Sequence, residues 1–333
     1  MRTGTERRPP TVLRVGVVDS GVGDVHAQRV LAAAAFQWSE GSGGAARPWL
    51  TARVWRSPGG HGGPQAGPGK QDGGTTGTGA GPRRDVAADA RAGLLAIAGD
   101  ELGHGDAVIG AISSLVPDAR LLVAKVFFGR FTTSAAQVAA AIDWLVSEQA
   151  DVINLSLGLR DHREVLAQAC ARAQAAGVVL CAASPARGAP VYPAAYPGVL
   201  RMTGDARCAR EELSWLATAQ ADFGGHVQPP PRARAGAGAS MGCAHLCGHV
   251  LRLLAAGSER SVAAVAAQLA AVARYRGPER RMAGAQSEVS LGESGRVEAA
   301  APGVGPAVDE SGAQAAVRAA RRDPDGEGTD AGA

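Results

Sequence analysis

The feature of this sequence that most constrains its fold is a regular alternation of short apolar runs with amphipathic stretches between residues 121 and 183. The apolar runs are residues 121–127, 151–157 and 178–183, and between them residues 134–149 and 163–176 carry apolar side chains at helical spacing. Runs of this length predict buried strands, and the stretches between them predict helices. Strand–helix–strand units connect in a right-handed sense, which makes their strands parallel. The sequence therefore predicts a three-layer α/β fold, with a mostly parallel sheet between helices on both faces.

Local signals support these boundaries. Ser134 and Gln137 have the spacing of a capping box at the start of a helix. Gly177 follows the second helix at a position where a left-handed C-cap is common. Residues 14–18 (RVGVV) predict a further strand that leads into Asp19, and residues 262–275 predict the last helix. Functional groups in such folds gather at the carboxyl ends of the strands, which is where Asp19 is expected.

The distribution of glycine and proline predicts how much of the chain folds. The sequence has 46 glycines and 19 prolines but only 4% aromatic residues. Residues 57–82 and 276–333 are low in complexity and have little to bury, so they predict a disordered insertion and a disordered tail. With residues 1–11 as a flexible N-terminus, one domain is expected at residues 12–275. The insertion is expected to be dispensable, and a gating or substrate-docking role is the alternative.

The charge and cysteine content exclude several classes of partner. The net charge is +3, from 34 basic and 31 acidic side chains, so neither nucleic acid nor a membrane surface is an expected partner. No apolar run reaches 18 residues and none follows the charged N-terminus, so a cytoplasmic protein is expected. The five cysteines include no CxxC pair and are expected to be reduced and buried. A metal site at Cys243 and Cys247 is the alternative, and it would need two further ligands.

Three polar residues lie among small residues: Asp19 in VVDSGVG, His104 in LGHGDAVIG and Ser240 in GASMGCAHLCG. A serine hydroxyl becomes a nucleophile when an imidazole takes its proton, and a carboxylate fixes the tautomer of that imidazole. Taken singly, Asp19 is an ordinary turn cap, His104 a loop histidine and Ser240 a helix N-cap. Their order along the chain, aspartate then histidine then serine, is one of the three orders known for a catalytic triad.

The surrounding motifs resemble those of the subtilisin-like serine peptidases, the subtilase family. VGVVDSGV resembles the aspartate motif, GHG the histidine motif and GASM…AHLCG the serine motif. ADVINLSLG resembles the strand whose end pairs with extended substrate, and GVVLCAA and YPAAYPGVL resemble the segments that follow it. The resemblance covers residues 12–35 and 85–257 and implies a catalytic triad of Asp19, His104 and Ser240. It also implies that the Ser240 backbone N–H helps to form the oxyanion hole, and that Ser156, Leu157 and Gly158 bind substrate.

Two departures from the family pattern bear on activity. Ala186 stands at the usual position of the oxyanion-hole asparagine, and loss of that donor typically costs about 2.7–4 kcal/mol of transition-state stabilisation. Ser184 and Arg187 are the alternative donors. Asp106 lies two residues after His104, where a nearby carboxylate would raise the histidine pKa or attract a basic substrate side chain. A solvated aspartate that caps a helix is the favoured interpretation.

The resemblance implies a serine endopeptidase that works through an acyl-enzyme and needs no metal or organic cofactor. The altered oxyanion segment favours a slow, selective enzyme that removes a leader peptide. In this it is similar to the small subtilisin-like proteases that mature a subunit of quinohemoprotein amine dehydrogenase. The expected partners are a modified precursor peptide and its modifying enzyme. An inactive peptide-binding module of the same fold and a general intracellular degradative protease remain the alternatives.

Overall fold

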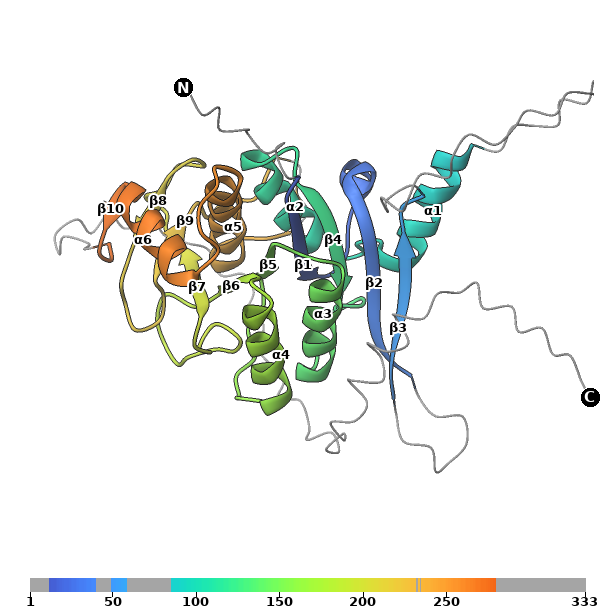
Figure 1. Cartoon of the computed structure of the whole chain (residues 1–333), viewed down its shortest axis with the longest axis horizontal. Coiled ribbons are helices and arrows are strands. Elements are labelled where there is room, and N and C mark those ends of the chain that lie inside the picture. Colours follow the sequence, from blue (N-terminus) through green and yellow to red (C-terminus); the bar gives the residue numbers. More distant parts are fainter. Residues whose placement is uncertain (1–11, 40–48, 59–84, 232, 234, 280–333) are drawn as a thin grey trace, which may run out of the picture.

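A computed structural model describes residues 12–39, 49–58, 85–231, 233 and 235–279. The predicted N-terminal segment (1–11), residues 59–82 of the predicted insertion and residues 280–333 of the predicted tail lie outside this description. The described residues form ten strands, seen edge to edge across Figure 1. In chain order these are β1 (Arg14–Asp19), β2 (Val30–Ser39), β3 (Trp49–Arg56), β4 (Arg120–Lys125), β5 (Val152–Leu155), β6 (Val179–Ala183), β7 (Val199–Gly204), β8 (Leu213–Trp215), β9 (Phe223–Gly225) and β10 (Tyr275–Arg276).

The strands form one sheet in the order β10-β8-β9-β7-β6-β5-β1-β4-β2-β3. Neighbouring strands are parallel except in the pairs β2–β3 and β8–β9, which are antiparallel. The predicted mostly parallel sheet is therefore confirmed. Strand β1 lies near its centre, between β4 and β5, which buries the strand that carries Asp19.

Helices cover both faces of this sheet. They are α1 (Val86–Ala98), α2 (His104–Leu115), α3 (Ala135–Ser147), α4 (Glu164–Ala175), α5 (Ala239–Ala255) and α6 (Val262–Val272), with a short 3-10 helix, η1, at Asp24–Arg29. Helices α3 and α4 pack side by side on one face, and α2 and α5 pack against each other on the opposite face (Figure 1). The three predicted layers are present.

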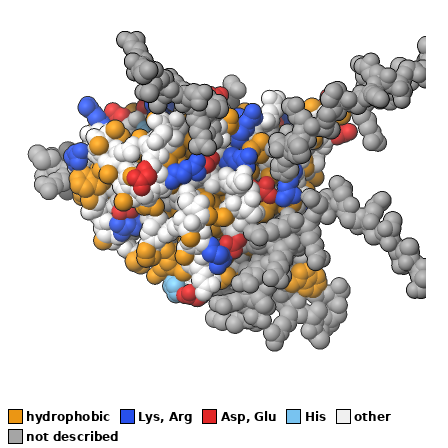
Figure 2. All heavy atoms as spheres, in the orientation of Figure 1, with side chains coloured by type: hydrophobic (Ala, Val, Ile, Leu, Met, Phe, Trp, Pro, Cys, Tyr) orange, Lys and Arg blue, Asp and Glu red, His pale blue; other side chains and the backbone are white. Residues whose placement is uncertain are grey.

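The alternation of side chains along β1 shows how two cores form. Val15 and Val17 belong to the hydrophobic cluster under α2 and α5, whereas Val18 belongs to the cluster under α3 and α4. Successive side chains of a strand point to opposite faces, so a strand buried on both faces is apolar throughout. On the face seen in Figure 2, acidic and basic side chains are interspersed, in keeping with the small net charge.

Several predicted boundaries agree with the structure and one differs. The Ser134–Gln137 capping box is present at α3, and Gly177 after α4 is left-handed with φ 76°. The last helix, α6, ends at Val272, and not at residue 275 as predicted. Tyr275 and Arg276 instead form β10 on β8. The edge of β8 offers backbone partners, and the Arg207 guanidinium lies 5.1 Å from the Tyr275 ring centroid, so sheet pairing replaces the last helical turn.

Candidate active site

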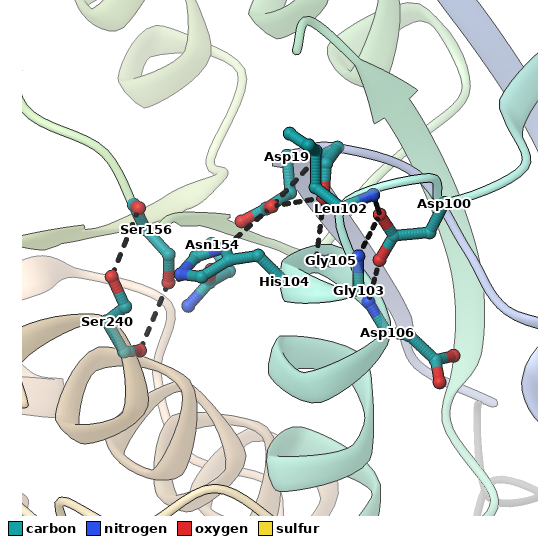
Figure 3. Close-up of polar contacts among 11 residues, drawn as sticks. Asp19, Asp100, Leu102, Gly103, His104, Gly105, Asp106, Asn154, Ser156 and Ser240 are labelled. Carbon is teal, nitrogen blue, oxygen red and sulfur yellow. Dashed lines mark hydrogen bonds and ion pairs between the residues drawn. The ribbon is translucent and has the colours of Figure 1, made fainter. Parts of the chain in front are cut away.

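Asp19 and His104 come from neighbouring elements and bind each other. Asp19 is the last residue of β1 and is fully buried, and His104 is the first residue of α2. Nδ1 of the imidazole lies 2.8 Å from Oδ1 of Asp19 (Figure 3). Because an ionised carboxylate only accepts hydrogen bonds, Nδ1 carries the proton and donates. Nε2 is then the basic nitrogen of His104.

Ser20 links Asp19 to the first turn of α2 through hydrogen bonds. Its backbone N–H and its hydroxyl both donate to Oδ1 of Asp19, at 2.7 and 3.1 Å. The hydroxyl oxygen in turn accepts the N–H of Gly105 at 2.9 Å. The other carboxylate oxygen of Asp19, Oδ2, is buried without a hydrogen-bond partner among the described residues. The sequence analysis missed the role of Ser20, although its place directly after Asp19 in the DSG motif was visible.

The His104 pKa is raised above its ordinary value of 6.5. Burial lowers this pKa, but the hydrogen bond to Asp19 and the negative charges of Asp19 and Asp100 raise it by more. Asp106, the carboxylate two residues after His104, is not among these causes. Its side chain instead accepts the N–H of Gly23 at 2.9 Å and faces His26 at 3.8 Å.

Ser240 lies at the start of α5, where the first backbone N–H groups of a helix have no intrahelical acceptor. Its hydroxyl donates to the backbone carbonyl of Ser156 at 3.3 Å, and the Ser156 hydroxyl donates to the Ser240 carbonyl at 3.2 Å. The Ser156 hydroxyl also lies 2.8 Å from Oδ1 of Asn154. No hydrogen bond joins Ser240 to His104 in the described part of the chain. The structure thus pairs Asp19 with His104 and Ser240 with Ser156 (Figure 3).

The register of the sheet explains why these two pairs lie at the same edge of the sheet. Val18 of β1 is paired with Leu155 of β5, so Asp19 and Ser156 follow directly at the carboxyl ends of adjacent strands. Helix α5 reaches the same edge because Gly242 packs against β7. A Cβ at Gly242 would lie 2.1 Å from the carbonyl oxygen of Thr203. Any larger residue at this position would therefore push α5 away from β7.

The segment predicted to bind substrate lies beside Ser240. Ser156 and Leu157 are nearly buried, and Gly158 is exposed. Directly afterwards, Leu159 and Tyr192 exchange backbone hydrogen bonds of 2.7 and 2.8 Å. This antiparallel bridge holds the end of the segment in place.

The predicted oxyanion segment borders a hollow of about 640 Å³. Ala186 and Arg187 are exposed and line this hollow together with Thr203 and Gly204. Ser184, one of the two proposed replacement donors, is buried, and its hydroxyl donates to the carbonyl of Gln220 at 2.6 Å. That hydroxyl is already satisfied within the protein, which leaves Arg187 as the exposed candidate.

An exposed aromatic side chain, missed by the sequence analysis, contacts the imidazole. Phe131 is 57% exposed. Its ring lies edge to face with His104 at 5.5 Å between centroids and with Phe127 at 5.8 Å. The sequence offered only a weak signal for it, a phenylalanine in the loop after a strand.

The cysteines show no sign of a disulfide or a metal site in the described residues. All five cysteines are buried and free. Within residues 12–39, 49–58, 85–231, 233 and 235–279, no cluster of three histidine, cysteine, aspartate or glutamate side chains could hold a metal ion. None of the helices described there is long and apolar enough to cross a membrane.

A buried aspartate bound to a histidine, with a serine at a helix start, at the carboxyl edge of a mostly parallel α/β sheet, is typical of the serine hydrolases. The model of the subtilase family matches residues 13–290. The chain therefore belongs to the subtilase family.

Individual relatives match over shorter stretches. The minor extracellular protease Epr of Bacillus subtilis (strain 168) is 31% identical over 116 residues, which cover 31% of this chain and 18% of that protein. The thermostable alkaline protease of Halalkalibacterium halodurans is 35% identical over 112 residues, which cover 30% of this chain and 31% of that protein. The chain thus spans less than a third of the length of these relatives. The solved structure of the prenylagaramide maturation protease PagA aligns with a TM-score of 0.37 and 19% identity, over 48% of this chain and 68% of that one.

Proposed function

We propose that this chain is a serine endopeptidase with Ser240 as nucleophile, His104 as general base and then acid, and Asp19 as the residue that orients His104. The observation that carries the proposal is the 2.8 Å contact between Nδ1 of His104 and Oδ1 of Asp19. This contact leaves Nε2 as the basic nitrogen, on the ring that Figure 3 shows between Asp19 and the Ser156–Ser240 pair.

In the proposed reaction the Ser240 hydroxyl leaves the Ser156 carbonyl, gives its proton to Nε2 of His104 and attacks the peptide carbonyl. His104 then transfers that proton to the leaving amine, which departs and leaves an acyl-enzyme. Water hydrolyses the acyl-enzyme by the same steps. The Ser240 backbone N–H faces the developing oxyanion. An extended substrate would bind Ser156–Gly158 through main-chain hydrogen bonds.

The finer role that we propose is selective maturation, in which the enzyme removes a leader from a precursor peptide in the cytoplasm. Ala186 supports it, because an alanine offers no side-chain donor to an oxyanion and an enzyme with a single substrate tolerates a slow chemical step. Its partners would be the precursor, carrying a modification, and the enzyme that modifies it.

Two observations favour a second candidate, a peptide-binding module without activity. The Ser240 hydroxyl donates to the Ser156 carbonyl and not to His104, and Ala186 has no side-chain amide. Binding along Ser156–Gly158 needs neither a nucleophile nor an oxyanion hole.

A serine-directed fluorophosphonate probe separates these functions. Wild type and Ser240→Ala would be treated with the probe and then offered candidate precursor peptides and casein. We expect labelling and peptide cleavage by the wild type alone. An unlabelled, correctly folded wild type would contradict the peptidase proposal. Digestion of casein at many sites would contradict the maturation role and support a degradative protease.

A further inference from the structure

A second carboxylate, that of Asp100, lies in the short loop before α2, the helix that begins at His104. Its Oδ1 accepts the backbone N–H groups of Leu102 and Gly103, at 3.1 and 2.8 Å. Its Oδ2 accepts the N–H of Asp106 at 2.8 Å (Figure 3). These donors lie on both sides of His104 in the chain. One side chain therefore fixes the backbone before and after the imidazole.

The start of α2 depends on this carboxylate. Gly103 occupies the N-cap position with φ 76° and has no side chain with which to cap the helix. The first N–H groups of a helix lack intrahelical acceptors, and a negative charge beside them is favourable. Asp100 meets both needs from outside the helix, and it holds a left-handed turn that glycine adopts readily.

We propose that Asp100 is a positioning residue for His104, one that sets the direction in which the imidazole leaves α2 toward Asp19. The inference rests on the proposed peptidase function, in which His104 is the base. The electrostatics agree with the geometry. Burial lowers the His104 pKa, and the charge of Asp100 is among the causes that raise it to a net value above normal.

The test compares Asp100→Asn and Asp100→Ala with a matched control, Asp106→Asn, in the full chain. Asp100→Asn removes the charge and keeps one oxygen as acceptor. Asp106→Asn removes the same charge two residues after His104, from a side chain that faces Gly23 and His26. The imidazole Cε1–H of His104 would be titrated by NMR, with His104→Gln as the assignment standard. The pH profile of kcat/KM would be measured in parallel.

We expect the His104 pKa to fall in Asp100→Asn and to stay unchanged in Asp106→Asn, with the rising limb of kcat/KM moving to lower pH in Asp100→Asn only. Asp100→Ala loses all three acceptor contacts, so its kcat should fall by up to about a hundredfold, with a smaller change in KM. An unchanged His104 pKa in Asp100→Asn, or an equal fall in Asp106→Asn, would overturn the proposal. The NMR titration needs no turnover, so it decides the role of Asp100 even if the wild type cleaves nothing, a result that counts against the peptidase function instead. The NMR titration of Asp100→Asn also decides the role of Asp100 if Asp100→Ala fails to fold.

Discussion

The Ser240 hydroxyl donates to the backbone carbonyl of Ser156 at 3.3 Å. In the proposed mechanism this carbonyl belongs to the segment that pairs with extended substrate, and the same hydroxyl must reach Nε2 of His104 before it attacks. A substrate N–H that bonds the Ser156 carbonyl would compete with Ser240 for it. Substrate binding would then release the Ser240 hydroxyl from the Ser156 carbonyl.

The pH dependence of activity follows from the raised pKa of His104. The base works only when neutral, so kcat/KM is expected to rise with pH and to reach half its maximum above pH 6.5, the ordinary histidine value. The effect on stability has the opposite sign. A raised folded-state pKa stabilises the fold below the unfolded pKa, and this contribution is lost as pH rises through the folded pKa. A pH–rate profile on one peptide checks the first statement. A half-maximum clearly below pH 6.5 would count against it.

Restoring an amide donor at residue 186 should speed the reaction. Ala186 is exposed at the edge of the 640 Å³ hollow, so an asparagine there meets no packed neighbours. Ala186→Asn is expected to raise kcat by up to about a hundredfold, since a donor of this type contributes ~10²–10³ in rate. Ala206→Asn, at another exposed alanine of the same hollow, is the control. No gain of activity in Ala186→Asn would contradict the placement of residue 186 beside the oxyanion.

Phe131 should matter for turnover more than for stability. Because its side chain is 57% exposed, Phe131→Ala is expected to change the free energy of unfolding by less than about 0.5 kcal/mol. The same variant loses the ring that packs edge to face with the His104 imidazole, and its kcat/KM should nevertheless fall. Urea titration and peptide kinetics measure the two effects. Val86→Ala removes a comparably exposed apolar side chain, 65% exposed, at the start of α1, and should change neither.

Two buried histidines on α5 should make the fold sensitive to acid. Burial, together with the positive charges of neighbouring groups, lowers the pKa of both His245 and His249 to about 4. A lowered folded-state pKa means that the unfolded chain binds more protons between pH 6.5 and 4. Stability should therefore fall as pH drops through that range, by on the order of 3 kcal/mol per histidine.

Urea midpoints between pH 7 and 4 test this expectation. His249→Gln should flatten the pH dependence, because glutamine does not titrate. The exposed His162, substituted in the same way, serves as the control and should leave the slope as in the wild type. Equal slopes in wild type and His249→Gln would refute the assignment.

The sequence predicted best the strands and helices that a single local pattern specifies. Apolar runs predicted β1, β4, β5 and β6, and helical spacing predicted α3 and α4. Strand β2 was missed because its central residues are four alanines, 32–35, which favour a helix when isolated. Its pairing with β3 and β4 overrides that preference.

In the candidate site, too, local motifs predicted some residues and others were missed. The motifs predicted Asp19, His104 and Ser240, and the structure joins the first two through a hydrogen bond. Residues two apart on a helix point to different sides, so the carboxylate of Asp106 reaches Gly23 and not the imidazole. Asp100 was missed because it caps α2 from three residues before the N-cap. Its contacts depend on the left-handed conformation of Gly103, a backbone conformation that a glycine permits but does not require.

The central place of β1 in the sheet determines how its backbone becomes accessible to solvent. Both edges of this strand are taken, by β4 and β5, and both of its faces are buried. Its amide protons can exchange with solvent only when the whole domain opens, since no local fluctuation frees a strand in the middle of a sheet. Hydrogen exchange at Val17 and Val18 should thus report the free energy of global unfolding, and Asp19 should keep its place until the fold is lost as a unit.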